Sequence, residues 1–101
     1  MSKKRHKIEV ELIGPIANYF FHLEEDQITL NRNQDKLEWV DADFAVDGEL
    51  NIHLACRSKN KKDKTCTLSI KVDGKGPRKY TRSFKKRLAV VNTELELPLS
   101  R

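Results

Sequence analysis

The chain has 101 residues, of which 38% are hydrophobic and 35% charged, and its formal net charge is +5. This length suits a single domain with a modest core, which we assign to residues 1–101, and the many charges indicate a highly charged surface. No apolar run approaches the roughly 20 residues needed to span a membrane. Residues 1–5, which we expect to be a disordered basic N-terminus, precede a charged segment and not the apolar stretch of a signal peptide, so we expect a cytoplasmic protein.

The N-terminal third reads as short strands. Alternating apolar and charged residues predict a strand from His6 to Ile13, which Gly14 and Pro15 end. Residues 16–25 have apolar spacings compatible with a helix and with a strand, and three successive aromatic residues favour the strand. A further short strand is expected at residues 28–30, followed by a polar loop over residues 31–35.

The apolar positions change phase between Leu37 and Val46. Leu37 and Trp39 are odd-numbered, whereas the later apolar residues are even-numbered: Val40, Ala42, Phe44 and Val46. Such a change predicts a β-bulge or a strand break near residues 39–41. Asp47 and Gly48 follow as a turn signal.

Residues 50–72 predict a central hairpin. Folding this stretch about Lys61 opposes apolar residues on one face, in the pairs Leu50–Val72, Ile52–Ile70, Leu54–Leu68 and Cys56–Cys66. A slip of one residue would turn one apolar set outward, so the alternation favours this register.

The C-terminal part adds more strands. A tight connection is expected at residues 73–77, a strand at 79–86, a short apolar run at 88–91 and a last strand at 93–99, with Leu95, Leu97 and Leu99 inward. About seven short strands in this length indicate an all-β fold, an antiparallel β-sandwich that is immunoglobulin-like or related. A small OB-like barrel is the alternative.

The sequence offers no catalytic, cofactor-binding or metal-binding residues. His53 and Cys56 stand three apart, so on one strand they face opposite sides of the sheet. Asp41, Asp43 and Asp47 do not match the spacing of a calcium-binding EF-hand loop. We expect Cys56 and Cys66 to remain buried thiols in a reducing cytoplasm, with a disulfide as the alternative.

The charge is unevenly distributed along the chain. Residues 8–50 carry eleven acidic and two basic side chains, and residues 51–101 carry fourteen basic and four acidic ones. The two halves either neutralise each other as neighbouring strands or leave the molecule with an acidic and a basic side.

These observations favour a non-enzymatic interaction module or assembly subunit that acts through protein–protein contacts, with another protein or a second copy as partner. The alternative is nucleic-acid binding by the strand 78–87 and the hairpin tip 59–64, since an aromatic and basic face can stack bases and hold phosphates. The residues predicted to bind a polyanion are Lys61, Lys62, Lys64, Arg78, Lys79, Tyr80, Arg82, Lys85, Lys86 and Arg87.

Overall fold

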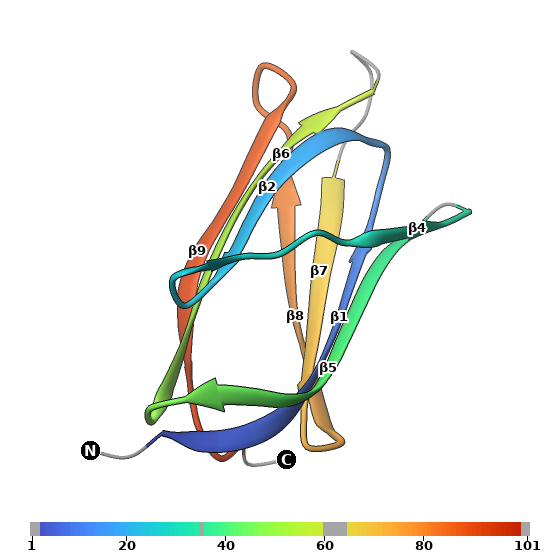
Figure 1. The fold of residues 1–101 in the computed structure, drawn as a ribbon. Coiled ribbons are helices and arrows are strands. Elements are labelled where there is room, and N and C mark those ends of the chain that lie inside the picture. The colour runs from blue at the N-terminus through green and yellow to red at the C-terminus, as the bar shows by residue number, and fades with distance from the viewer. Residues whose placement is uncertain (1–2, 35, 60–64, 100–101) are drawn as a thin grey trace.

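The computed structural model of the protein describes residues 3–34, 36–59 and 65–99. Over these residues the chain forms strands, and it contains no helix long and apolar enough to cross a membrane. The strands make two antiparallel sheets that pack together (Figure 1). The predicted β-sandwich is therefore confirmed, and the barrel alternative is wrong.

Each sheet is assembled from strands that are distant in the sequence. Sheet A has, in spatial order, β4 (Asn31–Asn33), β5 (Lys36–Val46), β1 (Lys4–Ile13), β7 (Thr65–Val72) and β8 (Lys75–Ser83). Sheet B has β3 (Asp26–Gln27), β2 (Ile16–Leu23), β6 (Glu49–Ser58) and β9 (Leu88–Glu96). The edge strands β8 and β9 contact each other on one side of the sandwich. On the other side the chain between β3 and β4 crosses from sheet B to sheet A (Figure 1).

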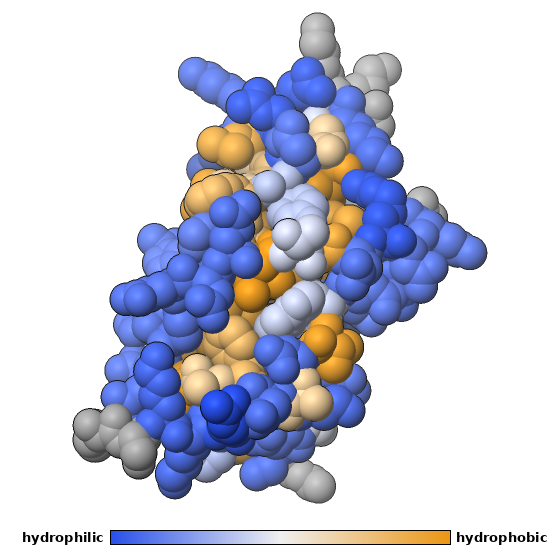
Figure 2. Space-filling model, viewed as in Figure 1, coloured by the Kyte–Doolittle hydropathy of each residue, from blue (hydrophilic) through white to orange (hydrophobic). Residues whose placement is uncertain are grey.

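The core lies between the inward faces of the two sheets, to which each long strand contributes alternate residues. In the view of Figure 1, hydrophilic side chains cover both flanks and a band of apolar side chains runs between them (Figure 2).

The hairpin predicted from residues 50–72 is wrong, although its buried residues are predicted correctly. All eight of its apolar residues are buried: Leu50, Ile52, Leu54, Cys56, Cys66, Leu68, Ile70 and Val72. However, β6 belongs to sheet B and β7 to sheet A, so the two strands face each other across the core and do not pair. Cys56 and Cys66 still meet, as free thiols with their Sγ atoms 3.6 Å apart. Alternation fixes which side chains are buried, but not which strand lies alongside.

The segment of ambiguous spacing is the strand β2, so the strand prediction for residues 16–25 is confirmed and the helix is wrong. Residues 28–30 lie outside any strand, against the prediction, although Ile28 and Leu30 are buried. The Tyr19 hydroxyl takes the place of a neighbouring strand there, because it hydrogen-bonds to the backbone of Leu30. The predicted polar loop over residues 31–35 contains the short edge strand β4.

β5 changes its buried face through a β-bulge at Ala42 and Asp43. In the pairing with β1, these two residues together oppose Lys7. The predicted bulge lay slightly earlier, near residues 39–41, and required Val40 and Ala42 to be buried. Both side chains are exposed, that of Val40 by 57%. The reason is that the alternation changes phase only at the bulge, so that even-numbered residues are buried from Phe44 onward.

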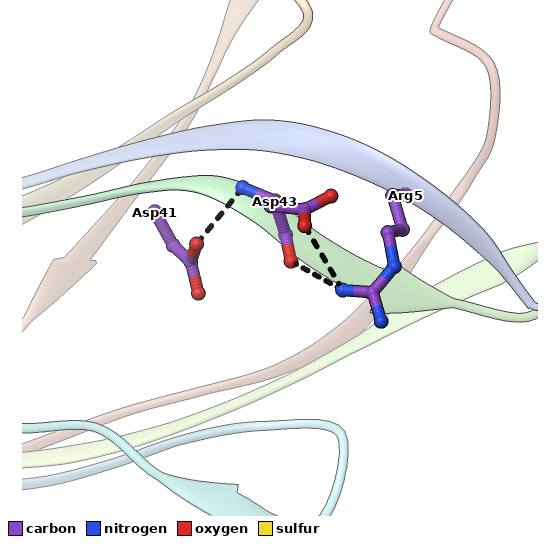
Figure 3. A network of polar contacts seen from close by, with 3 residues as sticks. All are labelled: Arg5, Asp41 and Asp43. Carbon is purple, nitrogen blue, oxygen red and sulfur yellow. Dashed lines mark hydrogen bonds and ion pairs between the residues drawn. The ribbon is translucent and has the colours of Figure 1, made fainter.

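Polar contacts hold this bulge together (Figure 3). The Asp41 carboxylate accepts the backbone N–H of Asp43 at 2.9 Å. Arg5 Nη1 donates to the carbonyl oxygen of Asp43 at 3.1 Å and to its carboxylate at 3.2 Å. β1 accordingly begins at Lys4, against the disorder expected over residues 1–5, of which Met1 and Ser2 lie outside the described residues.

The C-terminal strands differ from the prediction mainly in their bounds. β8 runs over Lys75–Ser83, earlier than the expected residues 79–86. The runs expected at 88–91 and 93–99 form one strand, β9, which ends at Glu96. The connection predicted at residues 73–77 is shorter, because residues 75–77 belong to β8. It is a two-residue turn, with φ of 53° at Asp73 and 77° at Gly74, as a type I′ hairpin turn requires.

Candidate functional site

The basic strand β8 lies at the edge of sheet A and does not present the predicted aromatic platform. Tyr80 and Phe84 are partly buried and pack against the core. Arg78 and Arg82 are half-buried on the same side of β8, where Arg82 stands opposite the buried Cys66. Burial raises the pKa of the Tyr80 phenol, with smaller opposing effects of Arg78 and Arg82. An exposed face on which bases could stack is therefore not formed by Tyr80, Arg82 and Phe84.

Arg87 has a structural role. Its Nη2 donates to the carbonyl oxygen of Ser58 at 3.0 Å and to that of Lys59 at 3.3 Å. The Ser58 N–H donates in turn to the carbonyl oxygen of Arg87 at 2.9 Å. These bonds bring the turn between β8 and β9 beside the end of β6.

A basic end of the molecule results from this contact. Its members are the exposed side chains Arg57, Lys59, Lys85 and Lys86. Of the other residues predicted to bind a polyanion, Lys79 lies apart, exposed on the outer face of sheet A. Lys61, Lys62 and Lys64 lie outside the described residues. Within the described residues, Lys85 and Lys86 thus lie at the basic end, apart from Lys79 and from the half-buried Arg78 and Arg82.

The outer face of sheet A is hollowed into a groove of about 460 Å³, where the acidic and basic parts of the chain adjoin. Glu9, Glu11 and Glu38 line it from β1 and β5, and Lys71 and Lys79 from β7 and β8. Lys36 lies 3.5 Å from the carboxylate of Glu11 and 3.7 Å from that of Glu38, and Glu9 stands opposite Lys71 in the sheet. Opposite charges therefore neutralise each other across these strands, and the groove has no dominant charge.

The outer face of sheet B carries an apolar patch, which consists of Phe20, Ala55, Leu88 and Val90. The register places Phe20, Ala55 and Val90 in one row across β2, β6 and β9. Phe20 is 55% exposed, Val90 50% and Leu88 43%, whereas Ala55 lies half-buried between them. Exposed apolar side chains on β2 and β9, joined by Ala55 of the strand between them, mark a contact surface more strongly than isolated ones do.

Imidazoles form the next row of the same face. His22 stands opposite His53, and His53 stands opposite Asn92 on the other side of β6. The ring of His22 packs on that of Phe20, with their centroids 4.5 Å apart. Within the part of the chain that the structure describes, the buried Nε2 of His22 makes no hydrogen bond.

An acidic cluster occupies the far end of this face. It consists of Glu24, Glu49, Glu94 and Glu96. A hydrogen bond to Glu94 raises the pKa of Glu49, and repulsion by Glu94, slight desolvation, and repulsion by Glu96 and Glu24 add to this rise. Glu24 accepts the backbone N–H of Asn51 at 2.6 Å and its side-chain amide at 3.0 Å, and Lys3 lines the same shallow hollow as Glu24.

The residue types that carry catalysis or bind metals do not form a reactive cluster within the described residues. His53 is exposed and Cys56 buried, as the spacing predicts. The pKa of the Cys56 thiol is raised by its hydrogen bond with Cys66 and by burial, which disfavours a nucleophilic thiolate. Asp41 and Asp43 are occupied at the bulge (Figure 3). Across residues 3–34, 36–59 and 65–99, no three His, Cys, Asp or Glu side chains are grouped to hold a metal ion.

Comparisons with protein-family models, with curated proteins and with solved structures gave no match to this chain. The argument for function therefore depends on the surfaces of the molecule.

Sequence reasoning missed the apolar patch, although a signal for it exists. In both Tyr19-Phe20-Phe21 and Leu88-Ala89-Val90-Val91, aromatic or aliphatic residues occupy successive positions. Because successive side chains of a strand point to opposite faces, such a run places apolar residues outside as well as inside.

Proposed function

We propose that the protein is a non-enzymatic interaction module or assembly subunit, and that it makes protein–protein contacts through the outer face of sheet B. The observation that supports this proposal is the apolar patch of Phe20, Ala55, Leu88 and Val90, which joins three strands of that face. The proposal places the protein in the cytoplasm, where reducing conditions keep Cys56 and Cys66 as thiols.

The composition of the patch and its position on hydrogen-bonded strands both suit a contact surface. Removing exposed apolar side chains from water stabilises an association, and aromatic residues are enriched where partners meet. β6 pairs along both edges, with β2 and with β9, so the patch sits on a hydrogen-bonded strand and not on a loop. A partner would therefore meet a preformed surface, with little ordering on binding.

Site-specific photo-crosslinking tests the proposal. The photoreactive residue p-benzoylphenylalanine replaces Phe20 in one variant and Val40 in a matched control. The control site suits the purpose because Val40 is 57% and Phe20 55% exposed, but Val40 lies on the outer face of sheet A. Both variants are irradiated in extract and as purified protein, and the adducts are identified by mass spectrometry.

The expected result is a defined protein adduct, a second copy or another chain, from position 20 and not from position 40. Equal labelling from the two positions, or no protein adduct from position 20, would contradict the proposal.

Nucleic-acid binding is a second candidate, and the exposed basic end supports it. Lys59, Lys85 and Lys86 are exposed beside the contact between β6 and the turn before β9. Anisotropy of labelled single- and double-stranded oligonucleotides, at about 50 and 200 mM salt, measures this activity. Replacement of Lys85 and Lys86 by Gln, with Arg87 kept because it bonds to Ser58, should weaken binding without loss of the fold. Unchanged binding in that variant would exclude this basic end as the site.

A further inference from the structure

The charge on the outer face of sheet B reverses from one end to the other. Arg57 stands near the end of β6, between the uncharged Asn18 and Leu88 of the neighbouring strands. Glu49 begins the same strand, opposite Glu96 of β9. At roughly 3.4 Å per residue, β6 separates Arg57 from Glu49 by about 27 Å.

The two charged ends do not neutralise each other within one molecule. Their separation exceeds the Debye length of about 8 Å at physiological ionic strength. Within the described residues, no ion pair joins Arg57, Glu49, Glu94 or Glu96 to a group of opposite charge. A hydrogen bond to Glu94 and repulsion by Glu94, Glu96 and Glu24 also raise the pKa of Glu49.

A face with one acidic and one basic end is complementary to itself in one orientation. Stacking two identical faces by a two-fold rotation requires an axis in the plane of the interface. An axis parallel to the strands would place Arg57 over Arg57 and the acidic cluster over itself. An axis perpendicular to the strands turns the second copy end for end, so that basic and acidic ends meet twice.

We propose that the outer face of sheet B binds the same face of a second copy, with the two β6 strands antiparallel. This inference rests on the proposed function and names its partner. Arg57 and the neighbouring lysines of each copy then lie over Glu49, Glu94 and Glu96 of the other. The row of Phe20, Ala55 and Val90 lies in the middle of the interface, beside the imidazoles of the second copy.

Charge reversal with rescue tests this arrangement by sedimentation velocity. The full chain should associate at about 50 mM salt and dissociate progressively as the salt concentration rises. Arg57→Glu alone, and Glu94→Arg alone, should each weaken association by about 10-fold or more, because each places like charges in contact. The double variant restores opposite charges at both ends, and it should recover the affinity to within about 3-fold.

Lys79→Glu is the matched control, since it reverses an exposed charge on the outer face of sheet A. It should leave the association unchanged. Circular dichroism and thermal melts of each variant establish that the fold is retained.

The outcomes separate this inference from the proposed function. A chain that stays monomeric up to about 1 mM, near the weak limit of specific association, overturns the second-copy inference. So does association that Arg57→Glu leaves unchanged or that the double variant fails to restore. In those cases an adduct of position 20 with a different protein still supports the proposed function, whereas the absence of any adduct overturns both.

Discussion

The hydroxyl of Tyr19 bonds both backbone groups of Leu30: it accepts the N–H at 2.8 Å and donates to the carbonyl oxygen at 3.2 Å. Tyr19→Phe removes both bonds and leaves a part-buried N–H and carbonyl without this partner. We expect the free energy of unfolding to fall by about 1–3 kcal/mol, measured by urea denaturation. Tyr80→Phe is the control, because its hydroxyl makes no hydrogen bond within the described residues. Equal effects of the two substitutions would refute this role of Tyr19.

The turn between β7 and β8 holds the first strand through Asp73. His6 Nδ1 lies 2.6 Å from one carboxylate oxygen of Asp73, and the other oxygen accepts the backbone N–H of Lys7 at 2.9 Å. The bonds to His6 and Lys7 lower the pKa of Asp73 below its ordinary value of 3.8. The stabilisation is therefore fully present above that value and is lost as the pH falls through the lower pKa of the folded state.

Asp73→Asn isolates this charge, because asparagine also tolerates the positive φ of 53° at this position. We expect a lower melting temperature than that of the native chain at pH 7, and a difference that narrows below about pH 4. A difference that stays constant over this range would show that the charge of Asp73 has no part in stability.

Gly14 is packed against the backbone of β7. A Cβ at this position would lie 3.0 Å from the Cβ of Cys66 and 3.1 Å from its Cα, and the φ of Gly14 is 150°. Gly14→Ala should destabilise the protein by about 1–3 kcal/mol through overpacking, in addition to backbone strain. Gly48→Ala is the comparison, because it introduces backbone strain without crowding. The φ of Gly48 is 77°, and nothing lies within 4 Å of the position that a Cβ would take. A larger loss of stability in Gly48→Ala than in Gly14→Ala would contradict the crowding argument.

Repulsion among the carboxylates of the acidic cluster should make the protein less stable as the pH rises, which is opposite to the effect of Asp73. The folded chain raises the pKa of Glu49 above its ordinary value of 4.5, chiefly through Glu94. The corresponding stability is fully present below that value and is lost as the pH rises through the raised pKa.

Glu94→Gln should therefore raise the melting temperature at pH 7 and have little effect near pH 4, with melting measured at low protein concentration. Glu38→Gln is the control, because Lys36 lies 3.7 Å from that carboxylate, and its removal should not stabilise the chain. A Glu94→Gln variant no more stable than the native chain at pH 7 would argue against net repulsion.

The sequence specifies the faces of the strands better than their partners. Alternation identifies Ile52 and Ile70 as buried, and both are. It cannot tell a neighbour in one sheet from a neighbour across the core, because both arrangements place apolar beside apolar. The predicted hairpin failed for this reason. The connection predicted at residues 73–77, which depends on local backbone preferences, does contain the turn between β7 and β8, but only at Asp73 and Gly74.

The features that required three dimensions are those that join distant residues. The bond of Arg87 to Ser58 changes a predicted polyanion-binding residue into a structural one. Phe20 and Val90 become neighbours of Ala55 only through the register of β6 with both of its partners. No local pattern contains that information.

The order of strands in sheet B has a consequence for synthesis of the chain. β6 pairs with β2 on one edge and with β9 on the other, and β9 follows both of these strands in the sequence. On the ribosome, a nascent chain lacking Leu88–Glu96 would present a bare edge along β6, open to pairing with another such chain. The chain should thus be most prone to aggregate after β6 has emerged from the exit tunnel and before β9 has paired with it.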